Sequence, residues 1–114
     1  MADMEAVKAA LDLMQVQVSQ LDDEFRGRLP NRSISAHILD HDVVYIGRLE
    51  AGFLVDLQEV TPAEGKDAAY RLASTSDDFI ELVAGRLSFT SAWASGRVRV
   101  NASFRDLFEL RRLL

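Results

Sequence analysis

The sequence predicts an α+β domain in which helices pack on the apolar face of one five-stranded, mainly antiparallel sheet. The hydrophobic period is 3.6 residues near the N-terminus and changes to 2 after residue 32, which indicates a helix followed by strands. Helical patterns return after residue 74, and helices that follow a meander of strands are typical of the α+β class. A chain of 114 residues is long enough for one core, so we expect a single domain spanning residues 1–114.

The first 30 residues predict one amphipathic helix over residues 3–28. Its apolar positions recur every three or four residues and form one stripe, made of Val7, Leu11, Met14, Val18, Leu21 and Phe25. Asp22, Asp23 and Glu24 are interpreted as a solvated face of its late turns. Leu29 precedes a proline, and because such a residue avoids helical dihedrals, the helix ends there.

Three strands are predicted next, over residues 33–40, 43–50 and 53–60. "DHD" at 40–42 indicates a turn, and Ala51-Gly52 a tight hairpin with Gly52 at positive φ. On the third strand, alternation puts Phe53, Val55 and Leu57 on one face and Asp56 and Gln58 on the other.

The second half of the chain predicts two more strands and three helices. "TPAEGKD" at 61–67 breaks the meander, and Thr75 or Ser76 is a suitable cap for the helix that follows. The expected elements are a strand over 68–75, a helix over 75–87 that Gly85 ends, a short helix over 88–95 that Gly96 ends, a strand over 97–103, and a last helix from the cap Ser103 to the C-terminus.

Composition excludes several classes of function. With a formal net charge of −5, the chain lacks the basic face that neutralises phosphates, so we expect no nucleic-acid partner. It has no cysteine, which excludes disulfides and thiolate metal sites and fits a cytoplasmic protein. No apolar run approaches the length of a transmembrane helix, and the N-terminus does not read as a signal peptide.

No residue constellation indicates catalysis, a metal or a cofactor. His37 and His41 lie among Asp40 and Asp42, but no third distant ligand is evident, so these histidines are interpreted as surface residues. There is no G-x-S-x-G elbow and no phosphate-binding loop. Asp77 and its neighbour Asp78 are explained by the positive end of a helix.

The segment from residue 70 to 114 resembles the lipid-binding domains of the sterol carrier protein 2 (SCP2) family. Three stretches carry the resemblance: "STSDDF", in which a strand ends and a helix opens; "AGRLSFTSAWASG", a helix end followed by a second short helix; and "SGRVRV", a glycine before an alternating strand. The upstream order of elements also fits. Many members show a glycine and a small polar residue where this chain has "NAS" at 101–103. The absence of a peroxisomal tail suits a stand-alone bacterial type of member.

The resemblance implies a non-catalytic carrier with a hydrophobic tunnel between the sheet and the helices. Its cargo would be a fatty acyl chain, an acyl-CoA ester, a sterol or a similar apolar molecule. The last helix is rich in large apolar residues, which suits a tunnel wall but equally suits an ordinary core. The residues expected to line the tunnel are Phe53, Val55, Leu57, Phe79, Val83, Trp93, Val98, Val100, Phe104 and Phe108.

Two alternatives to a carrier remain open at this point. One is a closed module of the same fold whose last helix packs against a second copy or another protein, which would form a homodimer through the C-terminal helix. The other is an enzyme that depends on His37 or His41. Arg97 and Arg99 on the fifth strand would suit an anionic head group or a transient membrane contact, or else they pair with Asp56 and Glu59 of the sheet.

Overall fold

The computed structural model describes residues 1–113 as an α+β fold built on a five-stranded mixed sheet. In the order β3-β2-β1-β4-β5, only the β1–β4 pair is parallel, and the other neighbours are antiparallel. The strands are β1 (Arg32–Ile38), β2 (Val43–Glu50), β3 (Phe53–Val60), β4 (Tyr70–Ser74) and β5 (Arg99–Asn101). The predicted fold class is therefore confirmed, and β5 is shorter than expected.

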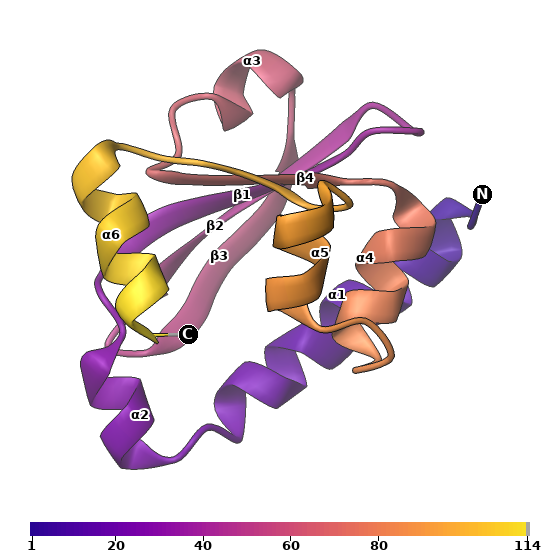
Figure 1. Ribbon diagram of the computed structural model, residues 1–114. Helices are drawn as coiled ribbons and strands as arrows, with labels where there is room; N and C mark the ends of the chain where they lie inside the picture. The colour runs from indigo at the N-terminus through magenta and orange to yellow at the C-terminus, as the bar shows by residue number, and fades with distance from the viewer. Residues whose placement is uncertain (114) are drawn as a thin grey trace.

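Helices cover the two faces of this sheet unequally (Figure 1). We call the face toward α1, α4 and α5 the inner face, and the face toward α3 the outer face. The helices are α1 (Met4–Ser19), α2 (Asp23–Arg28), α3 (Pro62–Gly65), α4 (Ser76–Val83), α5 (Phe89–Ser95) and α6 (Phe104–Leu113). The core lies on the inner face, where Val7 and Leu11 of α1 meet Ile38, Tyr45 and Phe79. No helix within residues 1–113 has the length and apolar character needed to cross a membrane.

The N-terminal segment forms two helices, which corrects the prediction of one helix over residues 3–28. The Asp22 side chain accepts a hydrogen bond from the backbone N–H of Phe25 at 2.8 Å and so caps α2. The acidic run at 22–24 therefore starts a second helix rather than continuing the first. The apolar stripe of the sequence passes through the corner between the helices, so its period alone does not show the break.

Arg26 fixes this corner with an almost fully buried guanidinium group. Its Nη2 donates to the carbonyl oxygens of Val18, Ser19 and Leu21 at 3.0 to 3.2 Å, which satisfies the free end of α1. Its Nη1 donates to the carbonyl of Gly52 at 2.7 Å, in the hairpin between β2 and β3. A Cβ on Gly52 would collide with the Arg26 side chain, and the backbone there has a positive φ of +82°. The close approach and the left-handed conformation both favour glycine at this position.

A β-bulge at Asp56 changes the alternation expected along β3. The register shifts between Ile46 and Arg48, and Asp56 takes a positive φ of 55°. Leu54 and Leu57 consequently both lie against the same cavity on the inner face. The expectation that Phe53, Val55 and Leu57 share one face is therefore wrong, because the bulge falls between the second and the third of them.

The short helix α3 occupies the segment in which only a chain break was expected. Thr61 and Glu64 form a reciprocal capping box around its first turn. Gly65 sits on Val44, and a Cβ there would clash with that valine. Because Val44 faces outward and is buried under α3, the outer face of the sheet is partly covered as well.

The caps predicted for the C-terminal helices are confirmed. Thr75 caps α4 by accepting from the Asp78 N–H, and Ser103 accepts from the Asp106 N–H at the start of α6. Gly85 and Gly96 both take a φ of 80° where the helices α4 and α5 end.

Asp40 ties the turn after β1 to the start of α4. Its carboxylate accepts hydrogen bonds from the backbone N–H and the hydroxyl of Ser76, at 2.8 and 2.6 Å. Desolvation raises the pKa of Asp40, but the hydrogen bonds from Ser76 and the nearby His41 outweigh it and hold the pKa below its ordinary value of 3.8. The ionised form is therefore the form that stabilises the fold.

Replacing Arg26 with alanine should lower the free energy of unfolding by about 3 kcal/mol, because four carbonyls lose a charged donor. Arg28→Ala is the matched control, since Arg28 is exposed and forms a surface ion pair with Glu24; it should cost less than about 0.5 kcal/mol. Urea denaturation measures both. Equal small losses would show that Arg26 does not hold the corner.

Asp40→Asn should make the stability of the protein less dependent on pH in the acid range. The pKa of Asp40 is lower in the folded state than in the unfolded state. Its ionised carboxylate therefore contributes its full stabilisation at pH values above the unfolded-state pKa, and this stabilisation is lost as the pH falls through the folded-state pKa. Urea denaturation between about pH 6 and about pH 2 should show a smaller decline for the variant than for the wild type. An exposed control, Asp12→Asn, should follow the wild-type curve, and a variant at Asp40 that also follows it would contradict the assignment.

Candidate ligand-binding site

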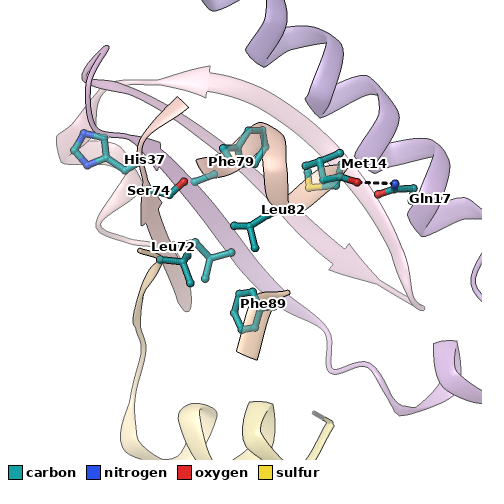
Figure 2. Close-up of a pocket in the computed structure, with 11 residues that line it drawn as sticks. Met14, Gln17, His37, Leu72, Ser74, Phe79, Leu82 and Phe89 are labelled. Carbon is teal, nitrogen blue, oxygen red and sulfur yellow. Dashed lines mark hydrogen bonds between the residues drawn. The ribbon is translucent and has the colours of Figure 1, made fainter. Parts of the chain in front are cut away.

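A first cavity of about 240 Å³ lies between the inner face of the sheet and the helices α1, α4 and α5. Figure 2 shows Leu72, Phe79, Leu82 and Phe89 converging on it from β4, α4 and α5, while the imidazole of His37 points away. Its full lining is Met14, Gln17, Ala36, His37, Leu72, Ser74, Phe79, Leu82, Val83, Phe89 and Val98. The surroundings are mainly apolar, so this space suits an apolar guest.

A second cavity of about 270 Å³ continues from the first toward the α1–α2 corner. It lies over β1, β2 and β3 and is apolar almost throughout. Its lining is Leu11, Met14, Val18, Leu21, Phe25, Leu29, Ile34, Ser35, Ala36, Tyr45, Leu49, Leu54, Leu57, Leu72 and Phe79. The corner that Arg26 holds thus supplies one end of the cavity.

The two cavities share a wall of four residues, Met14, Ala36, Leu72 and Phe79. These residues come from α1, β1, β4 and α4. Ala36 adds little bulk, and Met14 is unbranched with several rotatable bonds, so the Met14 side chain can adjust to a guest that spans both spaces. Joined, the cavities reach the volume range of about 300–1,000 Å³ that is usual for small-molecule sites.

Tyr45 lines the second cavity and carries a buried hydroxyl group. This oxygen is buried and has no hydrogen-bond partner among the described residues. Burial raises the pKa of Tyr45, and the negative charge of Glu59 raises it further, so the phenol stays neutral and keeps its proton. An unpaired buried hydroxyl is costly, so Tyr45 pays a desolvation penalty in the ligand-free protein.

The structure brings only some of the predicted lining residues to the cavities. Phe79 lies at both, Val83 and Val98 line the first, and Leu57 lines the second. The others lie outside both linings: Phe53, Val55, Trp93, Val100, Phe104 and Phe108.

Three of these outlying residues have identifiable surroundings. The Phe53 ring lies 4.0 Å below the guanidinium carbon of Arg26, and Trp93 packs edge-on against Phe89 with ring centroids 5.8 Å apart. Phe104 is 88% exposed. A role for the six in ligand contact stays a prediction.

The N-terminal helices contribute wall residues that were not among the predicted ligand contacts. Met14, Val18, Leu21 and Phe25 were recognised as part of one apolar stripe but were not named as ligand contacts. Tyr45 was also missed, although a tyrosine on the apolar face of a strand carries a hydroxyl that needs a partner. The alternation of residues in "VVYIGRLE", which puts Tyr45 on the same face as Val43 and Leu49, could have identified it.

The histidines and serines of the described residues do not form a catalytic set. His37 Nε2 lies 2.8 Å from Asp42 Oδ1, and His41 Nε2 lies 2.6 Å from the carbonyl of Ala2. The buried hydroxyl of Ser76 donates to Asp40 and not to a histidine. Within residues 1–113, no three His, Cys, Asp or Glu side chains are grouped to hold a metal ion. The geometry thus supports holding an apolar molecule and offers no base placed for a nucleophile.

Comparison with solved structures shows an SCP2-like fold over nearly the whole chain. The crystal structure of Sterol Carrier Protein 2 Like 2 from Aedes aegypti matches with a TM-score of 0.67 and 10% identity, covering 97% of this chain and 98% of that one. The same mosquito protein in its palmitated form matches with a TM-score of 0.64 and 11% identity, over 98% and 94% of the two chains. UbiJ-SCP2, a ubiquinone synthesis protein, matches with a TM-score of 0.62 and 16% identity, over 99% and 92%.

The same fold occurs inside a larger enzyme. The stereoselective inverting sec-alkylsulfatase Pisa1 from Pseudomonas sp. matches with a TM-score of 0.57 and 19% identity, over 85% of this chain. The chain corresponds to only 15% of the length of that sulfatase. No protein-family model and no curated protein matches the sequence. The neighbours thus establish the fold, and the site carries the functional argument.

Tyr45→Phe should leave the ligand-free protein as stable as the wild type or more stable by up to about 1 kcal/mol, because it removes a buried hydroxyl without a partner. Thermal unfolding of delipidated protein measures this. Tyr45→Leu is the control, since it also removes the ring and should destabilise by about 2 kcal/mol. A loss of more than about 1 kcal/mol in the phenylalanine variant would contradict an unpaired hydroxyl.

Proposed function

We propose that this protein is a non-catalytic carrier that holds one apolar molecule in the joined cavities under its helices. The observation that carries the proposal is the shared wall of Met14, Ala36, Leu72 and Phe79 between two apolar spaces. The cargo is a fatty acyl chain, an acyl-CoA ester, a sterol or a similar molecule, and a palmitated neighbour of the same fold supports the acyl class. The absence of cysteine agrees with a cytoplasmic place of action.

Burial of the cargo supplies the driving force. Each methylene group that leaves water contributes about 0.8 kcal/mol, less the cost of ordering the chain. Tyr45 donates its proton to an acceptor on the cargo, such as a carbonyl or hydroxyl oxygen, and so fixes the orientation. An ionised carboxylate is disfavoured deep in this cavity, because it would lose its hydration and face the field of Glu59.

The direct test is titration of delipidated protein with a fluorescent long-chain fatty acid, followed by displacement with acyl-CoA and with a sterol. Saturable binding at one ligand per chain, with displacement, is the expected result, and the ranking of competitors identifies the cargo class. Folded, monodisperse protein that binds none of the three would overturn the carrier proposal.

Ala36→Leu should weaken fatty-acid binding about tenfold or more while the free energy of unfolding stays the same or rises. The added methyl groups enter the wall between the cavities, fill empty space and exclude the guest. The matched control is Ala94→Leu, an exposed position on α5 that lines neither cavity. If both variants bind like the wild type, the ligand does not pass the shared wall.

A rival function rests on the exposed aromatic residues of α6. Phe104 and Phe108 lie one helical turn apart and are 88% and 61% exposed. In this alternative they dock on a second copy of the chain, which forms a homodimer through α6. Light scattering during size-exclusion chromatography distinguishes the two: the carrier proposal expects the same monomer mass for the wild type and Phe108→Asp, and a dimer that this substitution dissociates favours the rival.

A further inference from the structure

The outer face of the sheet carries a groove of about 220 Å³ on the side opposite the cavities. It runs between α3 and the edge strand β5. Its polar lining consists of hydrogen-bond donors, namely Ser35, His37, Lys66, Arg71, Arg99 and Asn101, and the rest of the lining is apolar. Among the side chains that the structure describes, no carboxylate lines it.

The strand register gathers these side chains into two rows. Ser35 pairs with Arg71, which pairs with Asn101. In the next row, His37 pairs with Ala73, which pairs with Arg99. Side chains of directly paired residues point to the same face of a sheet, so two arginines from neighbouring strands project together. Lys66 joins them from the end of α3.

Several arginines outside this groove form ion pairs with carboxylates. Arg48 pairs with Asp56, Arg86 with Glu81 and Arg97 with Asp78. Arg97 is therefore engaged by a carboxylate of the protein itself. This partner, Asp78, lies on α4, whereas Asp56 or Glu59 of the sheet was expected.

The groove's own arginines lack such acids. Arg71 donates from Nη1 to the carbonyl of Lys66 at 3.0 Å, and its buried Nε has no partner among the described residues. Arg99 has no ion pair within the described part of the chain. His37, which lines the groove, is engaged with the carboxylate of Asp42.

We propose that this groove binds the phosphate group of a ligand. A phosphate offers several acceptor oxygens, and guanidinium groups match them with paired donors. Lys66, Arg71 and Arg99 have no ion pair within the described part of the chain, so their charges supply attraction despite a net charge of −5. Ser35 and Asn101 supply neutral polar contacts. Soluble phosphate esters and phospholipid head groups both carry this chemistry.

The test combines two probes with charge-matched variants. Amide chemical shifts are followed during titration with inorganic phosphate at constant ionic strength, with chloride as the reference anion. The variants are Arg71→Gln with Arg99→Gln, Arg99→Gln alone, and the control Arg86→Gln, which removes the same charge at the Glu81 pair. Flotation with phosphatidylcholine vesicles, with and without phosphatidic acid, separates the two sources of phosphate.

The wild type should show saturable shifts at residues 66, 71 and 99. The double variant should bind phosphate about tenfold or more weakly, and Arg86→Gln should stay within about twofold of the wild type. Arg99 is exposed, so its single variant keeps the test decisive if the double variant unfolds. Flotation that requires phosphatidic acid and Arg99 assigns the lipid source, and phosphate binding without flotation assigns the soluble source. Absent shifts at the groove, or equal losses in Arg99→Gln and Arg86→Gln, would overturn the proposal.

Discussion

The buried guanidinium of Arg26 is the interaction on which the shape of the inner face depends. It joins the end of α1, the start of α2 and the β2–β3 hairpin through one set of hydrogen bonds. Without such an anchor, the corner would expose unsatisfied carbonyls, and Leu21 and Phe25 would have no fixed position over the sheet. Because these two residues form the end of the second cavity, a polar interaction determines where an apolar space is closed.

The cavities themselves depend in part on a small residue at the middle of the sheet. Ala36 on β1 lines both cavities and adds little bulk to the inner face. The outer face has the opposite character, since β4 presents Arg71 and β5 presents Arg99 there. Alternation along the strands thus gives the sheet an apolar side and a cationic side, and β1 and β4 contribute to both.

Local signals in the sequence were sufficient for most of the fold and for part of the site. Gly52, Thr75, Ser103 and Gly96 mark their turns and caps through side-chain chemistry that needs no distant partner, and the elements they bound are confirmed. The break between α1 and α2 was missed because it depends on Arg26 reaching Gly52, 26 residues away. The bulge at Asp56 was missed for a similar reason, since register is a property of two strands. Phe79, Val83, Val98 and Leu57 were expected to line a tunnel and do line the cavities. Phe104 and Phe108, which the resemblance to the family placed in a tunnel wall, lie exposed on α6, and their part in ligand contact stays a prediction.

The measurement that tests the carrier proposal most directly is an isotope-filtered nuclear Overhauser experiment on delipidated protein loaded with uniformly ¹³C-labelled palmitate. If the joined cavities hold the acyl chain, its methylene protons will show contacts to Met14, Leu72 and Phe79 together, since these residues wall both spaces. Contacts confined to Phe104 and Phe108 on the surface of α6, or no contacts at all at saturating ligand, would contradict the cavity as the site of binding.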